Sequence, residues 1–292
     1  MTQNLEQFID PGSTEIERIS TIDKETFSKE YMRAKKPVVF TDLMNQWPAT
    51  QKWSLAYFKT LTPNESALYA EVGDIVQHTD FQKIQFGRYI DTLLNGDSNS
   101  KKPVYLADFN IFQNFPSLED DVDFSLLSSN TLKTRINGWI GPANTVANYH
   151  VDWADNLFAQ LQGRKFVKLI SPEYNAQMYP SKRFDAGSLL SAIDADNYDA
   201  AKYPRYREAK SQYTVLEPGE MLYIPYGWWH YIRALDPSIS INCFAWGWKG
   251  VLFDLPLKHV RKRLHALNLY GMNGCTCHMM KDGKRVSRTM SY

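Results

Sequence analysis

Short extended segments follow one another between Thr134 and Trp246, and this region constrains the fold more than any other. Residues 135–140 and 239–244 alternate in polarity, whereas residues 165–170 are rich in β-branched and other apolar side chains. Gly and Pro mark the turns, and no long helical pattern separates the segments. Many short strands without intervening long helices predict a sandwich or a barrel. We therefore expect a mainly β fold with flanking helices.

Regions with a different pattern flank these strands and divide the chain into three expected parts. Residues 1–133 mix helical and extended patterns, and we expect them to pack on a core formed by residues 134–250. Residues 251–292 are expected to form a helix and a tail. Within the core, residues 181–213 are a long polar insertion, which is more typical of a functional flap than of a plain connection.

Composition excludes several classes of protein. The 292 residues carry a formal charge of +1, from 33 basic and 32 acidic side chains, so binding to nucleic acid or to an anionic membrane is not expected. The chain lacks an apolar run of about 18 residues, and its first residues, MTQNLEQFID, lack the pattern of a signal peptide. Three cysteines are too few for a disulfide framework, which predicts a cytoplasmic protein.

Two potential metal ligands, His150 and Asp152, lie two positions apart on a predicted strand. Side chains at this spacing project from the same face of a strand, so both can reach one ion. His230, shortly after the predicted strand 221–225, is the candidate third ligand. Two imidazoles and one carboxylate on one face of a metal leave three coordination positions open, an arrangement typical of non-haem Fe(II) oxygenases.

The three residues alone leave different interpretations open. A His-x-Asp pair is common on strands, and a single histidine is more often structural or exposed than a ligand. Zn(II) is the alternative metal, because it also binds two histidines and one aspartate, with water at the fourth position.

Longer patterns surround these ligands. The core contains GPANTVANYHVDWADNLFAQLQGRKFVKLISPEYNAQMYP, LEPGEMLYIPYGWWHYIRAL and SISINCFAW, and the upstream region contains KPVVF, QWPA and KWSLAYF. Taken in their order along the chain, over residues 35–250, these segments resemble the Jumonji-C (JmjC) family. Within that family the sequence is most similar to the cupin-like protein hydroxylases, which include the asparaginyl hydroxylase factor inhibiting HIF.

The resemblance implies a double-stranded β-helix, or jelly roll, as the core. It implies Fe(II) bound by His150, Asp152 and His230, and 2-oxoglutarate as cosubstrate, whose keto-acid end would take two of the three open positions. The implied activity is that of a dioxygenase, which converts 2-oxoglutarate to succinate and CO₂ while it hydroxylates a C–H bond. The metal carries the difficult chemistry, and the protein positions the reactants and excludes water.

The distal carboxylate of 2-oxoglutarate needs a cation, because an unpaired buried carboxylate is costly. Lys165 stands in the family's place for that cation. By strand parity it shares a face with Val167 and Leu169 and lies opposite Lys168. A solvated strand lysine is the alternative. Since the neighbouring basic residues cannot all face outward on one strand, we favour the pocket.

Further pocket residues follow from the same resemblance. Tyr105, in a Tyr-Leu segment, would donate its phenol to the same carboxylate, with a core tyrosine as the alternative. Asn156 matches the asparagine near the metal-binding end of the cosubstrate. Asn242 is a candidate helper from the last core strand.

Two positions depart from the family. Ala147 replaces the usual Ser or Thr three positions before the first ligand histidine, and Thr145 and Asn148 are the candidates for the missing hydrogen bond. Phe244 stands where factor inhibiting HIF has an asparagine, which bears on the substrate side of the pocket.

The C-terminal part carries weaker signals. Residues 252–268 predict an amphipathic helix whose apolar stripe would pack on the barrel or on a second subunit, so a homodimer through this helix is one expectation. The stripe consists of Leu257, Val260, Leu264 and Leu267. His259 and His265 of the same helix are expected at the surface. Cys275, Cys277 and His278 are too few for a structural zinc site and favour a flexible tail.

The leading hypothesis is hydroxylation of an amino-acid side chain in a protein or peptide substrate. Demethylation of N-methyl-lysine is the runner-up within the same chemistry, because the same oxidant hydroxylates N-methyl groups. A small-molecule hydroxylase and a non-catalytic, cupin-fold metal-binding protein also stay open at this point. A pure binding protein would need no carboxylate-binding lysine beside the metal ligands.

Overall fold

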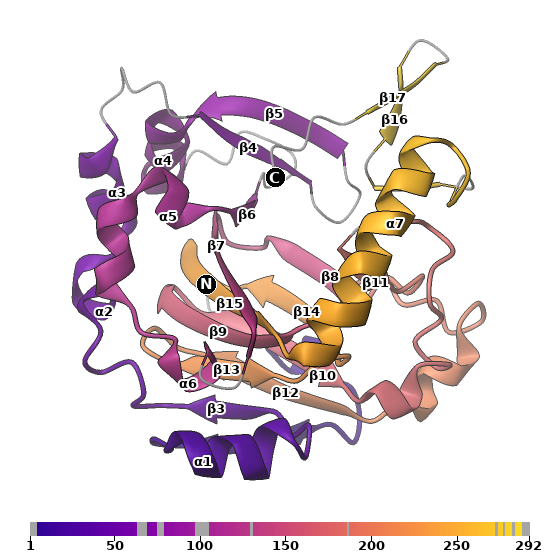
Figure 1. Cartoon of the computed structure of the whole chain (residues 1–292), viewed down its shortest axis with the longest axis horizontal. Helices are drawn as coiled ribbons and strands as arrows, with labels where there is room; N and C mark the ends of the chain where they lie inside the picture. Colours follow the sequence, from indigo (N-terminus) through magenta and orange to yellow (C-terminus); the bar gives the residue numbers. More distant parts are fainter. Residues whose placement is uncertain are drawn as a thin grey trace.

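Two β-sheets form the centre of the chain, and helices and long loops cover their outer faces (Figure 1). The computed structural model describes residues 5–62, 69–74, 79–96, 105–128, 131–185, 187–271, 274–276, 278–281 and 284–287.

The first sheet has the order β1-β12-β10-β14-β8-β11. Its strands are β1 (Thr14–Glu15), β12 (Ser211–Leu216), β10 (Lys165–Ile170), β14 (Trp229–Ala234), β8 (Val146–Asp152) and β11 (Ser188–Leu190). The second sheet has the order β2-β3-β13-β9-β15-β7-β6. Its strands are β2 (Arg18–Ile19), β3 (Val38–Phe40), β13 (Met221–Ile224), β9 (Asp155–Gln162), β15 (Ser238–Trp246), β7 (Lys133–Gly141) and β6 (Leu106–Phe109).

The connections between the sheets make the core a jelly roll. From β7 to β10 successive strands alternate between the second and the first sheet, and β13, β14 and β15 alternate again. Antiparallel pairing holds the neighbours, as in β14 with β8 and β15 with β9. The predicted mainly β, cupin-like fold is confirmed.

Three apolar layers follow from the alternation of side chains along the strands. The inner layer, between the sheets, contains Val167 and Leu169 of β10 and Leu222 of β13. The other face of β10 places Phe166 and Ile170 in a second layer, against the insertion. A third layer lies outside the second sheet, where the N-terminal helices cover residues such as Ile239 and Ile241 of β15. Parity along each strand therefore decides which side chains reach the interior.

Short helices cover the second sheet. They include α1 (Lys24–Thr26), η2 (Phe27–Met32), α2 (Pro48–Lys52), α3 (Leu55–Leu61), α4 (Phe86–Leu94), α5 (Ile111–Asn114), η3 (Pro116–Asp121) and α6 (Ser125–Ser128). The first helix, η1 (Leu5–Phe8), packs instead on the outer face of the first sheet. Asp23 accepts hydrogen bonds from the amides of Glu25 and Thr26 and caps α1, and Ser54 accepts one from the amide of Tyr57 and caps α3. The hairpin of β4 (Tyr69–Asp74) and β5 (Thr79–Gln85) precedes α4.

The polar insertion is ordered and joins the first sheet. It contributes β11, which pairs with β8. Further along the insertion, η5 (Pro204–Glu208) precedes the start of β12. The connection leading into it begins with η4 (Pro172–Tyr174). The segment is thus a wall beside the barrel that supplies a strand of its own.

The C-terminal helix leaves most of its predicted apolar stripe exposed. It consists of η6 (Gly250–Asp254) and α7 (Leu255–Ala266) and crosses in front of β8 and β11 (Figure 1). Leu257, Val260 and Leu267 of the predicted apolar stripe are 46%, 52% and 67% exposed, so the stripe does not pack on its own barrel. Among the described residues, no helix is long and apolar enough to cross a membrane.

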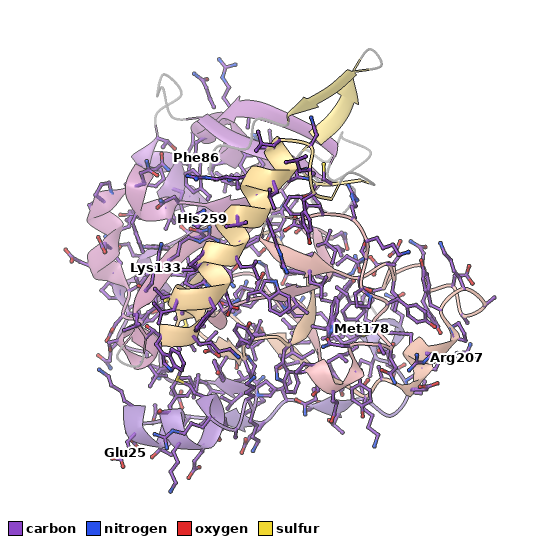
Figure 2. All side chains as sticks on the ribbon, turned by 45° about the vertical axis from the view of Figure 1, so that its right-hand side comes forward. Glu25, Phe86, Lys133, Met178, Arg207 and His259 are labelled. Carbon is purple, nitrogen blue, oxygen red and sulfur yellow. The ribbon has the colours of Figure 1, made fainter. Side chains whose placement is uncertain are left out.

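The two histidines of this helix have different surroundings. His259 is exposed on α7 (Figure 2), as predicted. His265 is only 2% exposed and stacks on Phe184 with ring centroids 4.1 Å apart, so its predicted surface position is wrong. A loop from the insertion covers it, which helical spacing alone does not reveal.

The segment after α7 is packed at the residues described. Phe184 N donates to Gly274 O, Thr276 N donates to Phe184 O, and Cys275 is buried. A flexible tail is therefore the wrong interpretation of residues 274–276, while Cys277 lies outside the described residues. The hairpin of β16 (His278–Lys281) and β17 (Lys284–Ser287) follows.

Candidate metal centre and cosubstrate pocket

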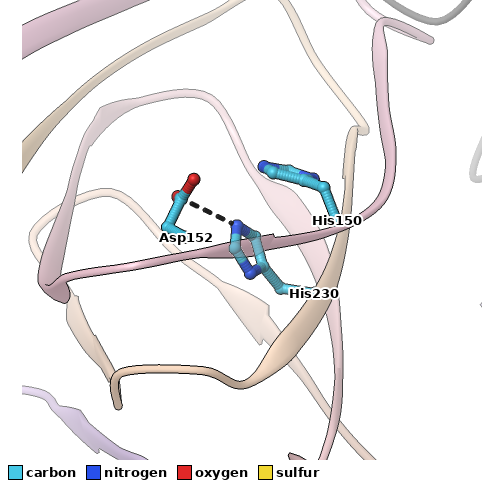
Figure 3. Close-up of side chains that lie close together, drawn as sticks. All are labelled: His150, Asp152 and His230. Atoms are coloured by element: carbon cyan, nitrogen blue, oxygen red, sulfur yellow. Dashed lines mark ion pairs between the residues drawn. The ribbon is translucent and has the colours of Figure 1, made fainter. Parts of the chain in front are cut away.

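The three predicted metal ligands lie close together on β8 and at the start of β14 (Figure 3). In the antiparallel pair β8–β14, His150 stands directly opposite His230, and Asp152 lies two residues further along β8 on the same face. One potential ligand atom from each residue lies within 4.8 Å of the others. His230 Nε2 is 3.4 Å from Asp152 Oδ2. Among the described residues, this is the one cluster of three His, Cys, Asp or Glu side chains that could hold a metal ion.

Backbone carbonyls orient both imidazoles. The Asn148 carbonyl lies 2.7 Å from His150 Nδ1, and the Trp228 carbonyl lies 3.1 Å from His230 Nδ1. A carbonyl only accepts, so each Nδ1 carries the proton and each Nε2 keeps a lone pair for a metal.

The charge states also suit ligation. Burial, followed by the nearby His230, lowers the pKa of His150 to about 4, which keeps this imidazole neutral. Burial raises the pKa of Asp152, but the neighbouring His230 and His150 and the hydrogen bond from Ser188 hold it below its usual value. The cluster therefore offers Nε2 of each imidazole and one anionic carboxylate as potential ligands.

A serine that sequence reasoning did not find also contacts Asp152. Ser188 Oγ donates to Asp152 Oδ1 at 3.0 Å, from the position on β11 directly opposite Asp152 on β8. Ser188 belongs to a three-residue strand inside the polar insertion, and no periodic pattern marks so short an element.

A pocket extends from the ligands into the barrel. All five residues predicted for the cosubstrate line it, together with both histidines and Asp152. These five are Lys165, Tyr105, Asn156, Thr145 and Asn242. The structure thus brings together residues from β8, β9, β10, β14 and β15 that are far apart in the sequence.

Lys165 lies at the inner end of this pocket. Its Nζ donates to Tyr105 Oη at 3.0 Å and to Ser240 Oγ at 2.6 Å. Ser240 was not predicted, although it shares strand parity with Asn242, which could have revealed it. Asn242 Nδ2 in turn donates to Asn156 Oδ1 at 3.0 Å. Thr145 Oγ1 donates to the Pro142 carbonyl at 3.1 Å, so its hydroxyl oxygen remains an acceptor at the pocket wall.

The pocket has the chemistry of an anion site. The Lys165 side chain is 1% exposed, and no carboxylate of the described residues forms an ion pair with it. Burial lowers the pKa of Lys165 to about 7. The indole Nε1 of Trp139 is also buried at this pocket and has no hydrogen-bond partner in the described part of the chain. A buried cation without an anion, beside an unused donor, fits a carboxylate ligand such as 2-oxoglutarate.

The two departures from the family pattern both lie at the pocket. Ala147 and Phe244 line it, so the absent hydroxyl and the absent amide are real changes of its wall. Asn148 points elsewhere: its amide donates to Ile193 O and accepts from Ala195 N, which attaches the insertion to β8. Of the two predicted substitutes for the missing hydroxyl, Thr145 is therefore at the pocket, while Asn148 holds the insertion.

A wider cavity of about 890 Å³ leads from the metal ligands to solvent. Its wall combines β6, β8, the insertion and α7, and includes Trp246, Lys258 and Asp108. Asp108 has a φ of 57° and accepts hydrogen bonds from Arg135 and Asn137. Trp229, by contrast, is fully buried in the outer layer of the first sheet.

Comparison with known proteins agrees with this architecture. The family model described as "Cupin-like domain" matches residues 24–246, which includes every strand from β3 to β15. The chain belongs to the cupin-like domain family.

Relatives of this cupin-like domain include named JmjC proteins. The chain is 33% identical to lysine-specific demethylase JMJ30 of Arabidopsis thaliana, over 79% of this chain and 54% of the relative. It is 33% identical to lysine-specific demethylase 8 of Xenopus tropicalis, over 80% and 53%. It is 29% identical to Jumonji C domain-containing protein 5 of Drosophila melanogaster, over 80% and 60%. The chain thus spans between about half and three fifths of the length of these relatives.

Proposed function

We propose that this chain is an Fe(II)- and 2-oxoglutarate-dependent dioxygenase that oxidises a side chain of a protein or peptide. The observation that carries the proposal is the buried ammonium of Lys165, which has no carboxylate partner in the described part of the chain and lines the same pocket as the three metal ligands. A zinc site needs no such cation, and neither does a cupin-fold protein that only binds metal.

The side chains have distinct tasks in this proposal. His150, Asp152 and His230 would hold Fe(II), which together with 2-oxoglutarate supplies the oxidising power of the reaction. The carbonyls of Asn148 and Trp228 fix the two imidazoles with Nε2 toward the metal. Lys165 would neutralise the distal carboxylate, and the hydroxyls of Tyr105 and Ser240 keep the ammonium in place. Burial raises the pKa of Tyr105, so its phenol remains a donor.

The names of the relatives bear on the outcome of the reaction. The residues alone favoured side-chain hydroxylation, whereas two of the relatives are named lysine-specific demethylases. We therefore place demethylation of N-methyl-lysine ahead of hydroxylation. Both begin with hydroxylation of a carbon; on an N-methyl group, the product then releases formaldehyde and leaves N–H.

The first test measures turnover of 2-oxoglutarate without a protein substrate. Purified protein with Fe(II), ascorbate and O₂ is expected to form succinate, and His150→Ala is expected to lower the rate about 1,000-fold or more, because a ligand of the catalytic metal is lost. Zn(II) in place of Fe(II) should give no succinate. Absence of iron-dependent succinate from the wild type, with and without peptide pools, would contradict the proposal.

The second test separates demethylation from hydroxylation. The substrates are peptides with mono-, di- or trimethylated lysine and unmethylated peptides of the same sequences. Each is incubated with the iron-loaded protein and 2-oxoglutarate, and its mass is then measured by mass spectrometry. Demethylation predicts loss of a methyl group with formaldehyde in equal amount. A gain of one oxygen on unmethylated peptides would instead restore hydroxylation as the main activity.

Several expectations stay predictions. They are the cytoplasmic location, the absence of nucleic-acid and membrane partners, the homodimer through α7, the division of the chain at residues 133 and 250, and the narrower likeness to factor inhibiting HIF. The exposed apolar residues of α7 support the dimer, which sedimentation of the full chain at several concentrations would test.

A further inference from the structure

The two oxygens of Asp152 have different partners. Oδ2 lies 3.4 Å from His230 Nε2, on the side where the potential ligand atoms converge. Oδ1 accepts the hydrogen bond of Ser188 at 3.0 Å, from the opposite direction in the sheet. Ser188 and Asp152 are cross-strand partners in the β11–β8 pair, so the contact is fixed by the backbone register.

The backbone around Ser188 is itself held in place. Asp185 Oδ1 accepts hydrogen bonds from the amides of Gly187 at 2.8 Å and Ser188 at 2.7 Å. Asp185 Oδ2 accepts from Thr276 Oγ1 at 2.6 Å, which ties the turn to the segment after α7. This turn leads directly into β11. Its hydrogen bonds fix the backbone at Ser188 and so restrict where the Ser188 hydroxyl can lie.

A carboxylate can ligate a metal through one oxygen or through both. With both oxygens on the metal, Asp152 would take one of the three positions that two histidines and a monodentate carboxylate leave open. 2-Oxoglutarate needs two positions and O₂ needs the third. An oxygen that already accepts a hydrogen bond is a poorer second ligand, since ligation would compete with that bond.

We propose that Ser188 is a positioning residue that holds Oδ1 of Asp152 away from the metal, so that Asp152 ligates through Oδ2 alone. The inference rests on the proposed metal site and deepens it. The insertion is then a part of the metal centre, because it keeps the position for O₂ open. Substrate or cosubstrate need not contact Ser188 at all.

The test uses Mn(II)-loaded full chain without cosubstrate. Broadening of the Mn(II) electron paramagnetic resonance lines by water enriched in the magnetic isotope of oxygen counts the water molecules on the metal. The key variants are Ser188→Val and Ser188→Thr, which have nearly the same shape and both suit a strand, but differ in the hydroxyl. We expect the valine variant to bind one water fewer than wild type, and the threonine variant to match wild type.

The functional consequence is measured separately. Ser188→Val should bind 2-oxoglutarate with an affinity within about 3-fold of wild type, yet its succinate formation should fall about 10–100-fold. Ser191→Ala is the matched control, because the Ser191 hydroxyl donates to the Met178 carbonyl and accepts from the Ile193 amide, away from Asp152. That control should keep the wild-type water count.

Each outcome decides the inference. An unchanged water count in Ser188→Val overturns it, and so does loss of Mn(II) binding, which would mean that Ser188 is needed for ligation itself. A threonine variant that behaves like the valine variant also overturns it. If the wild type shows no 2-oxoglutarate turnover but the water count changes as expected, the proposed function fails while the role of Ser188 stands.

Discussion

Two lysines of β10, Lys165 and Lys168, are almost completely buried on opposite faces of the same strand. Lys168 Nζ lies 2.8 Å from Asp10 Oδ2, and the hydroxyls of Tyr206 and Ser211 also donate to that carboxylate. Lys165 has two hydroxyl partners but no such anion among the described residues. The charge of Lys168 is neutralised by a carboxylate of the same chain, whereas the surroundings of Lys165 suit a carboxylate of a bound ligand.

The comparison separates structural from functional burial of charge. Breaking a buried pair leaves an uncompensated charge, so Lys168 and Asp10 depend on each other for folding. Lys165 has no such partner among the described residues, so burial disfavours its charged form and lowers its pKa to about 7. A bound carboxylate would remove this penalty, so ligand binding and protonation of Lys165 are expected to be linked.

The strongest test removes each of the two lysines in turn. Lys165→Ala should weaken 2-oxoglutarate binding to the Mn(II)-loaded protein about 100-fold, because about 3 kcal/mol of a desolvated ion pair is lost. Lys168→Ala, on the same strand, should lower the midpoint of chemical unfolding and leave that affinity within about 2-fold. Calorimetric titration and urea unfolding of both variants check this. Equal effects of the two variants on 2-oxoglutarate affinity would break the comparison.

The partner of Lys168 gives the next largest effect. Asp10→Asn keeps the size and the acceptor of the side chain but removes its charge. We expect the free energy of unfolding to fall by about 2 kcal/mol, a value reduced from that of a fully buried pair because the Asp10 side chain is 35% exposed. Urea unfolding measures the loss. Cosubstrate affinity should not change, and a selective loss of that affinity would contradict the structural role.

The pH dependence of binding sharpens the contrast further. In the free pocket Lys165, with a pKa of about 7, is protonated below that pH and neutral above it, and the carboxylate of the ligand favours the protonated form. Affinity for 2-oxoglutarate should therefore fall as pH rises above about 7, by up to about tenfold per pH unit. In Lys165→Arg the guanidinium stays charged, so residual binding should not show this fall. Titrations at several pH values compare the two proteins.

The smallest effect concerns the unused indole. Trp139→Phe keeps the aromatic surface beside Tyr105, whose ring centroid is 6.0 Å away, but removes the buried Nε1 donor. Loss of one neutral hydrogen bond, about 1 kcal/mol, should weaken 2-oxoglutarate binding about 5-fold. Without ligand, the variant should be as stable as wild type or more stable, because an unpaired buried donor is removed. If Trp139→Phe lost much stability but kept its affinity for 2-oxoglutarate, the Nε1 donor would have a structural role and no role in binding.

Local periodicity predicts much of the site. The spacing of His150 and Asp152 places both on one strand face, and parity along 165–170 places Lys165 inward and Lys168 outward, as the structure has them. His230 was proposed from its place just after the predicted strand 221–225, and the likeness to the JmjC family supplied the further pocket residues, which no local rule connects. Each of these predictions concerns a long strand or a long matching segment.

The remainder depends on contacts between distant segments. Ser188 reaches Asp152 because a three-residue strand pairs with β8, and Asp10 reaches Lys168 from the far N-terminal end. His265 is buried because Phe184 covers it, although its helical position suggests solvent. Such contacts are set by the register of non-adjacent strands and by loops, and a single sequence carries no periodic signal for either.

The N-terminal segment that carries Asp10 lies outside the region matched by the family, which begins at residue 24. Within this segment Phe8 packs against Phe166, and β1 pairs in parallel with the edge of β12. A shortened chain starting at residue 24 would keep every metal ligand, yet it would leave Lys168 without its carboxylate and β12 with an open edge. A version of this domain cut at the family boundary is therefore expected to be less stable than the full chain and to expose the edge of β12 to other chains.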